Sequence, residues 1–138
     1  MKKTLSLIAA ISFLFVLAPT LSLAQESAEI TPQWLKGAWT GGWPNPVVAG
    51  NDTVEINFDT NGKFAGQLNS QRGGLIYLLF ATYSISNEEI VLSGMYRSDH
   101  KAVDGKDFKA ALRRDGNALT GKWFGVTSTQ NLTLHKKN

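Results

Sequence analysis

Four segments of this sequence place a large apolar residue two positions after a glycine. They are Gly37-Ala38-Trp39, Gly66-Gln67-Leu68, Gly94-Met95-Tyr96 and Gly121-Lys122-Trp123, and their glycines are 29, 28 and 27 residues apart. This spacing is that of one β-hairpin repeated four times. Because residues two apart on a strand share a face, each glycine lies on the same face as its large partner. We expect these glycines to bend the strands and to leave space for a neighbouring indole ring, so that the sheet closes into a small barrel.

The sequence between these segments is typical of an all-β chain. Apolar and polar residues alternate, and turn residues interrupt the alternation at short, regular intervals. After residue 24 we find no segment with the periodicity of a helix. We expect eight strands, at residues 37–43, 53–59, 63–69, 75–85, 89–97, 106–114, 118–125 and 130–136.

The loops between these strands are of two kinds. Those after even-numbered strands are short, such as 59–62 and 115–117, and their Asn-Gly and Asp-Gly pairs suit hairpin turns. Most of those after odd-numbered strands are longer. The fold class that we predict is one antiparallel up-and-down meander of about eight strands closed into a small barrel, with tight turns at a closed end and long loops at an open end. A two-layer β-sandwich is the alternative, because glycine kinks serve sandwiches as well.

The first 24 residues have the pattern of a secretory signal peptide. Two lysines precede an apolar run at 5–18, and Ser22 and Ala24 are small residues at the positions that a signal peptidase reads. An uncleaved anchor is the alternative, but the run is short for a bilayer and Pro19 interrupts it. We expect a bacterial protein, periplasmic or secreted, without a membrane span after cleavage. The chain then divides into a signal peptide at 1–24, an N-terminal segment at 25–36 and a barrel domain at 37–138.

The composition excludes several classes of function. Two of the 14 basic residues lie in the signal peptide, which leaves 12 against 11 acidic residues, so that the charge gives no case for nucleic-acid binding. Without any cysteine, no disulfide holds the fold together, and its stability has to come from the core or from sheet closure. The two histidines and the carboxylates show no metal-ligand spacing, so we expect neither a metal nor a cofactor.

One short motif resembles that of a known superfamily. The segment Leu35-Lys36-Gly37-Ala38-Trp39 is similar to the Gly-x-Trp motif in the first strand of calycins, which comprise lipocalins, fatty-acid-binding proteins and avidins. This resemblance implies an up-and-down barrel that holds a small ligand. The chain lacks the C-terminal helix of lipocalins and the helical lid of fatty-acid-binding proteins. The polar residues that follow an avidin's first tryptophan are replaced here by residues 40–44, so that the resemblance does not extend to biotin binding.

A second resemblance covers most of the chain after the signal peptide. The segment from Phe108 to Trp123 is similar to the end of the small β domain that precedes some exported bacterial α/β hydrolases, although Ala110 stands where glycine is usual. This resemblance implies the same kind of fold and an accessory role, without an activity of its own.

We expect the binding site at the open end of the barrel. Trp43, Leu68, Tyr96 and Trp123 fall late in odd-numbered strands, and the loops there contribute Arg72, Arg97 and His100. Aromatic walls with a few polar groups are typical of a small-ligand pocket, so we predict a small apolar or aromatic ligand. The alternative is that these rings simply fill the interior, because a barrel of eight strands is just wide enough for side chains or for one small ligand. The protein would then be a periplasmic protein-binding module, such as an inhibitor or an accessory subunit.

We expect no catalytic residues. Ser98-Asp99-His100 combines three residue types of a catalytic triad, but consecutive residues in an extended loop point in different directions and cannot form one together. His135 lies on the outward face of the last strand without an evident partner.

The segment 75–85 is apolar on both of its faces, so one set of large side chains has to face outward. We expect Ile76, Leu78 and Phe80 to form a surface for self-association or for a protein partner, because exposed apolar groups of this size usually mark an interface. The alternative is that residues 30–34 cover this face.

Overall fold

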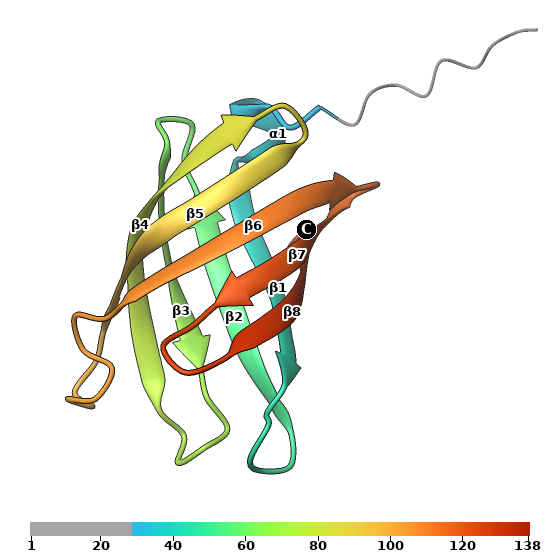
Figure 1. Ribbon diagram of the computed structural model, residues 1–138. Coiled ribbons are helices and arrows are strands. Elements are labelled where there is room, and N and C mark those ends of the chain that lie inside the picture. The colour runs from blue at the N-terminus through green and yellow to red at the C-terminus, as the bar shows by residue number, and fades with distance from the viewer. Residues whose placement is uncertain (1–28) are drawn as a thin grey trace, which may run out of the picture.

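The computed structural model describes residues 29–138, which form a closed barrel of eight antiparallel strands in simple up-and-down order (Figure 1). The expected signal peptide at 1–24 lies outside the described residues. The strands are β1 (Gly37–Pro44), β2 (Asn51–Phe58), β3 (Lys63–Asn69), β4 (Ile76–Ser86), β5 (Glu89–Arg97), β6 (Asp107–Asp115), β7 (Ala118–Phe124) and β8 (Thr129–Lys136).

The predicted fold class is confirmed. Every expected strand is present, and each of its ends lies within two residues of the expected position. The sandwich alternative is wrong, because β1 pairs with β8 and so closes the sheet, with Gly41 opposite Leu134. Closure gives the first and last strands a hydrogen-bonding partner and removes the two open edges that a flat sheet would expose.

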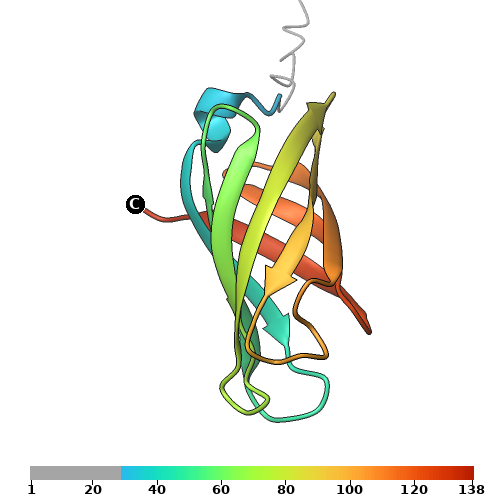
Figure 2. The same cartoon turned by 90° about the vertical axis from the view of Figure 1, so that its left-hand side faces the viewer.

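The two kinds of loop lie at opposite ends of the barrel, as expected. The β2–β3, β4–β5 and β6–β7 turns share the end near α1, whereas the longer β1–β2, β3–β4 and β5–β6 loops extend from the other end (Figures 1 and 2). Asn87 in the β4–β5 turn has a φ of 55°, the left-handed conformation that asparagine tolerates better than most residues.

A one-turn helix, α1 (Pro32–Leu35), precedes the barrel and was not expected from the sequence. Thr31 caps it by accepting a hydrogen bond from the Trp34 backbone N–H at 3.1 Å, and Pro32 occupies its first turn, where the missing N–H is no loss. So short a helix presents no repeat of apolar positions, and only its capping residues could have indicated it.

The segment that contains α1 closes one end of the barrel (Figure 2). Ile30 and Leu35 are buried in the core, and the Trp39 indole N–H donates a hydrogen bond to the Leu35 carbonyl at 2.7 Å. The Arg114 guanidinium lies 4.1 Å from the centre of the Trp34 ring. The expectation that residues 30–34 could cover the outward face of β4 is therefore wrong, because they cover the barrel end and leave that face exposed.

The inward glycines act differently from the expectation. A Cβ atom added to Gly66 would overlap the carbonyl oxygen of Glu55, and one added to Gly121 would overlap that of Ala111. At Gly94 it would overlap the Cβ of Ala81. The space at these positions is thus occupied by the neighbouring strand, which comes unusually close, and not by an indole ring. The expected room for an indole ring is therefore wrong, and the expected bending of the strands at these glycines stays a prediction.

Gly37 also differs from the other glycines of the repeat. Its φ of 115° is a conformation that side chains rarely adopt, and a Cβ there would meet only Lys136 Cε at 3.5 Å. Gly37 therefore serves the change of direction between α1 and β1. The close approaches in β1 occur at Gly41 and Gly42, where a Cβ would overlap the carbonyl oxygens of Thr133 and Asp52, respectively.

We predict that Gly121→Ala lowers the free energy of unfolding by about 1–3 kcal/mol and that Gly121→Val prevents folding, because either side chain has to displace the β6 backbone. Urea denaturation followed by circular dichroism measures both. Gly125→Ala is the control, since its nearest contact would be the Ser128 carbonyl oxygen at 3.3 Å and its φ is outside the left-handed range. A Gly121→Val protein as stable as the native one would contradict this role.

Candidate functional site

A hollow of about 190 Å³ opens between the long loops at the open end of the barrel. The strands give it an aromatic wall, and the β1–β2, β3–β4 and β7–β8 loops give it a rim that includes Val47, Arg72 and Thr127. The wall comprises Trp43, Leu68, Tyr77, Tyr96 and Trp123.

The rings of the wall pack against one another in fixed orientations. The Trp43 and Trp123 ring centres are 5.8 Å apart, and those of Tyr77 and Tyr96 are 5.9 Å apart. Trp123 also stacks on Phe108, with ring centres 4.7 Å apart and an angle of 8° between the planes. Phe108 is fully buried, so the barrel interior next to the hollow is filled by side chains. The predicted pocket and the predicted packed interior thus coexist at different depths.

A buried hydrogen bond connects two of these rings. The Trp123 indole N–H donates to the Tyr96 hydroxyl oxygen at 2.9 Å, which satisfies a donor that would otherwise be buried without a partner. Burial raises the pKa of Tyr96 to about 12, against the lowering effect of this hydrogen bond. Burial also raises the pKa of Tyr77, and the negative charge of Asp52 acts in the same direction. Both phenols are therefore neutral at physiological pH.

Asp52 is a part of the site that the sequence analysis missed. Its carboxylate lines the hollow with only 7% of the residue exposed. One oxygen, Oδ1, accepts hydrogen bonds from Asn45 Nδ2 at 2.8 Å and from the Gln71 backbone N–H at 2.9 Å, while Oδ2 accepts one from Trp43 Nε1 at 3.2 Å. Asp52 therefore connects the β1–β2 and β3–β4 loops to the wall. Its position two residues before Val54, on the inward face, could have indicated it.

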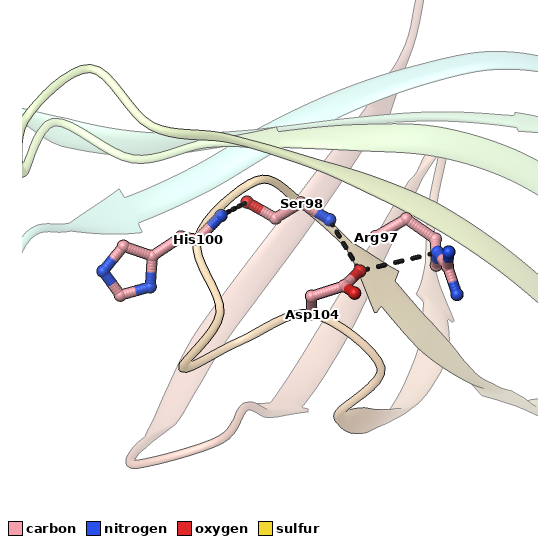
Figure 3. A network of polar contacts seen from close by, with 4 residues as sticks. All are labelled: Arg97, Ser98, His100 and Asp104. Atoms are coloured by element: carbon pink, nitrogen blue, oxygen red, sulfur yellow. Dashed lines mark hydrogen bonds and ion pairs between the residues drawn. The ribbon is translucent and has the colours of Figure 1, made fainter.

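Five of the seven predicted site residues line the hollow, namely Trp43, Leu68, Arg72, Tyr96 and Trp123. The structure does not bring Arg97 and His100 to it. Arg97 Nε pairs with Asp104 Oδ1 at 3.5 Å, and the same oxygen accepts a hydrogen bond from the Ser98 backbone N–H at 3.1 Å (Figure 3). Arg97 and His100 therefore make contacts within and beside the β5–β6 loop instead of lining the hollow.

The arrangement of Ser98 and His100 follows from the same loop. The Ser98 hydroxyl oxygen accepts a hydrogen bond from the His100 backbone N–H at 3.1 Å, and the imidazole ring points away from the other labelled side chains (Figure 3).

Within residues 29–138, no group of three or more histidine, aspartate or glutamate side chains is placed to hold a metal ion. No helix in that range is both long and apolar enough to cross a membrane.

The chain has no match among protein-family models, curated proteins or solved structures. The eight-stranded up-and-down barrel is compatible with a calycin-like fold.

We predict that the Tyr96 hydroxyl makes folding pH-dependent. The phenol keeps its proton to about pH 12 in the folded protein but loses it near pH 10 when unfolded, so the folded state binds more protons in between. The free energy of unfolding should therefore fall by up to about 3 kcal/mol as the pH rises from 10 to 12. Urea titrations at several pH values measure this fall.

The variant Tyr96→Phe separates this effect from the titration of lysines. It should lose about 1–3 kcal/mol at pH 7, because the Trp123 N–H loses its acceptor, and it should have a flatter dependence between pH 10 and 12. Identical slopes for the two proteins would show that Tyr96 does not control this range.

Proposed function

We propose that this protein is an exported, non-enzymatic binding protein that holds a small molecule of about one aromatic ring in the hollow at its open end. The observation that carries the proposal is the hollow itself, whose wall is mostly aromatic and largely buried, while its exposed rim includes polar side chains such as Arg72 and Thr127. This combination is what small-molecule sites usually present, since apolar walls supply affinity and a few polar groups supply orientation.

The size of the hollow limits the ligand. A volume of about 190 Å³ is close to that of a cavity of about 150 Å³ that binds benzene, and it is below the range of about 300–1,000 Å³ of drug-sized pockets. The Phe108–Trp123 stack prevents a longer ligand from entering the interior. A single ring or a short branched chain therefore fits within the hollow, whereas a fatty acid would extend out of it.

The wall is rigid before a ligand arrives. Trp43 is held by its hydrogen bond to Asp52, and Trp123 is held by its hydrogen bond to Tyr96 and by stacking on Phe108. Side chains that are already ordered lose little conformational entropy on binding, so that even a small ligand retains most of its contact energy.

Native mass spectrometry of protein purified gently from its own source tests the proposal. We expect a recurrent additional mass of roughly 100–200 Da, the size that one ring and its substituents would have in such a hollow. The variant Ser70→Trp should lose this mass, because Ser70 lines the hollow and an indole there would fill it. Ser84→Trp is the control, since Ser84 is an exposed residue of β4 outside the hollow. Protein that never carries an additional mass, or a Ser70→Trp variant that keeps it, would contradict the proposal.

A second candidate function rests on the outward face of β4. Ile76, Leu78 and Phe80 are 55%, 46% and 55% exposed, as the sequence predicted, and Met95 lies beside Phe80 across the β4–β5 pair. We name these four residues the β4 patch. Apolar side chains so exposed are typical of protein interfaces, and a second copy of this chain is the first partner to test.

We expect the native protein to self-associate in light scattering coupled to size-exclusion chromatography. The variant Phe80→Ser should weaken this association, because it removes the aromatic ring of the β4 patch. Phe124→Ser is the control, since Phe124 is a similarly exposed ring on β7. A native protein that stays monomeric up to millimolar concentration would rule out the second copy as the partner.

A further inference from the structure

Asp52 combines burial with the absence of a cationic partner. None of the ion pairs within residues 29–138 includes it, although the residue is 93% buried. Buried carboxylates are usually paired with a cation, because neutral hydrogen bonds replace only part of the hydration that a charge loses. The site therefore contains a negative charge that the described residues stabilise through three neutral donors alone.

The hydrogen bonds of this carboxylate leave room for one more donor. An ionised carboxylate offers about four acceptor positions, and Asp52 uses three. The unused position belongs to Oδ2, whose one partner is Trp43 Nε1 at the rather long distance of 3.2 Å. A ligand in the hollow that donates an N–H or O–H group would complete the set.

The surroundings of Asp52 favour a positive charge on that ligand. Four aromatic rings line the same hollow, and the faces of tryptophan and tyrosine rings attract cations. The other charged residue of the lining is Arg72, which is exposed on the rim and has no ion pair with Asp52. The residues of the wall therefore carry no positive charge that could neutralise the buried carboxylate of Asp52.

We propose that the hollow binds a small organic ammonium ion, that is, a primary amine attached to an apolar group of about one ring, with its ammonium group on Asp52 Oδ2 and its apolar part against the wall that Trp43 and Trp123 form. This inference rests on the proposed function and names its class of ligand. A metal ion fits the site poorly, because Asp52 is the one carboxylate in the lining. Among residues 29–138, no cluster of three or more histidine, aspartate or glutamate side chains is placed to hold a metal ion. An anion would meet the buried carboxylate and be repelled.

Three probes of nearly equal shape test the proposal on the native protein. They are benzylammonium, benzyl alcohol and benzoate, which differ in charge while each carries one ring. Binding is followed through the indole N–H signals of ¹⁵N-labelled protein. The signals of Trp43 and Trp123 should shift, whereas those of Trp34 and Trp39, which pack together at the closed end, serve as internal controls.

We expect benzylammonium to bind about ten-fold more tightly than benzyl alcohol, and benzoate to bind more weakly than either. Equal affinity of the alcohol and the ammonium ion would overturn the preference for a cation while leaving the proposed function intact. Preference for benzoate would overturn it as well and would assign the recognition to Arg72. Absence of any shift at Trp43 and Trp123 with all three probes would overturn both proposals.

The variant Asp52→Asn tests the carboxylate directly. It should reduce the ratio between benzylammonium and benzyl alcohol to nearly one while benzyl alcohol still binds. Asp59→Asn is the matched control, because Asp59 also accepts backbone N–H groups, those of Asn61 and Lys63 at 2.8 and 2.9 Å, but lies at the closed end. If Asp52→Asn does not fold, the comparison of the three probes on the native protein decides the question.

Discussion

The barrel depends on how closely neighbouring strands approach at four inward glycines. At Gly41, Gly66, Gly94 and Gly121 the adjacent strand occupies the place where any other residue would carry its Cβ atom. Each odd-numbered strand contains one of these four sites, and β1 has a further close approach at Gly42, where a Cβ atom would overlap the carbonyl oxygen of Asp52. The sheet closes where β8 pairs with β1, and the large side chains of Trp39, Leu68, Tyr96 and Trp123 are buried in the enclosed core.

Closure also determines where side chains can fill the interior and where they cannot. The end near α1 is filled by Ile30, Leu35 and Trp39, which belong to the buried core together with the neighbouring rings. Toward the long loops the rings of Trp43 and Trp123 are still ordered by hydrogen bonds and stacking, but the loops beyond them leave the hollow open. The hollow is therefore a consequence of loop length at one end of an otherwise packed barrel.

Strand positions and closure could be predicted from the sequence because both are local properties repeated along the chain. Alternation locates each strand, and the glycine spacing indicates the bends, although not that backbone occupies the space. The site is harder to predict from the sequence, because its residues come together only in the folded protein. Trp43, Leu68, Tyr96 and Trp123 were found from their place late in odd-numbered strands. Arg97 was misplaced because it follows the inward Tyr96 at the end of β5 and therefore faces outward, where it pairs with Asp104. Asp52 was missed because β2 begins two residues earlier than the alternation of apolar side chains indicates.

The two ends of the described chain lie at the same end of the barrel. Lys136 in β8 donates a hydrogen bond to the Trp34 carbonyl oxygen at 2.6 Å, and the Lys137 backbone N–H donates one to the Ala38 carbonyl oxygen at 2.8 Å. The chain thus enters and leaves the barrel beside α1, on the side opposite the hollow. A surface, a label or a fused domain attached at either end would therefore hold the molecule with its open loops directed away from the attachment point.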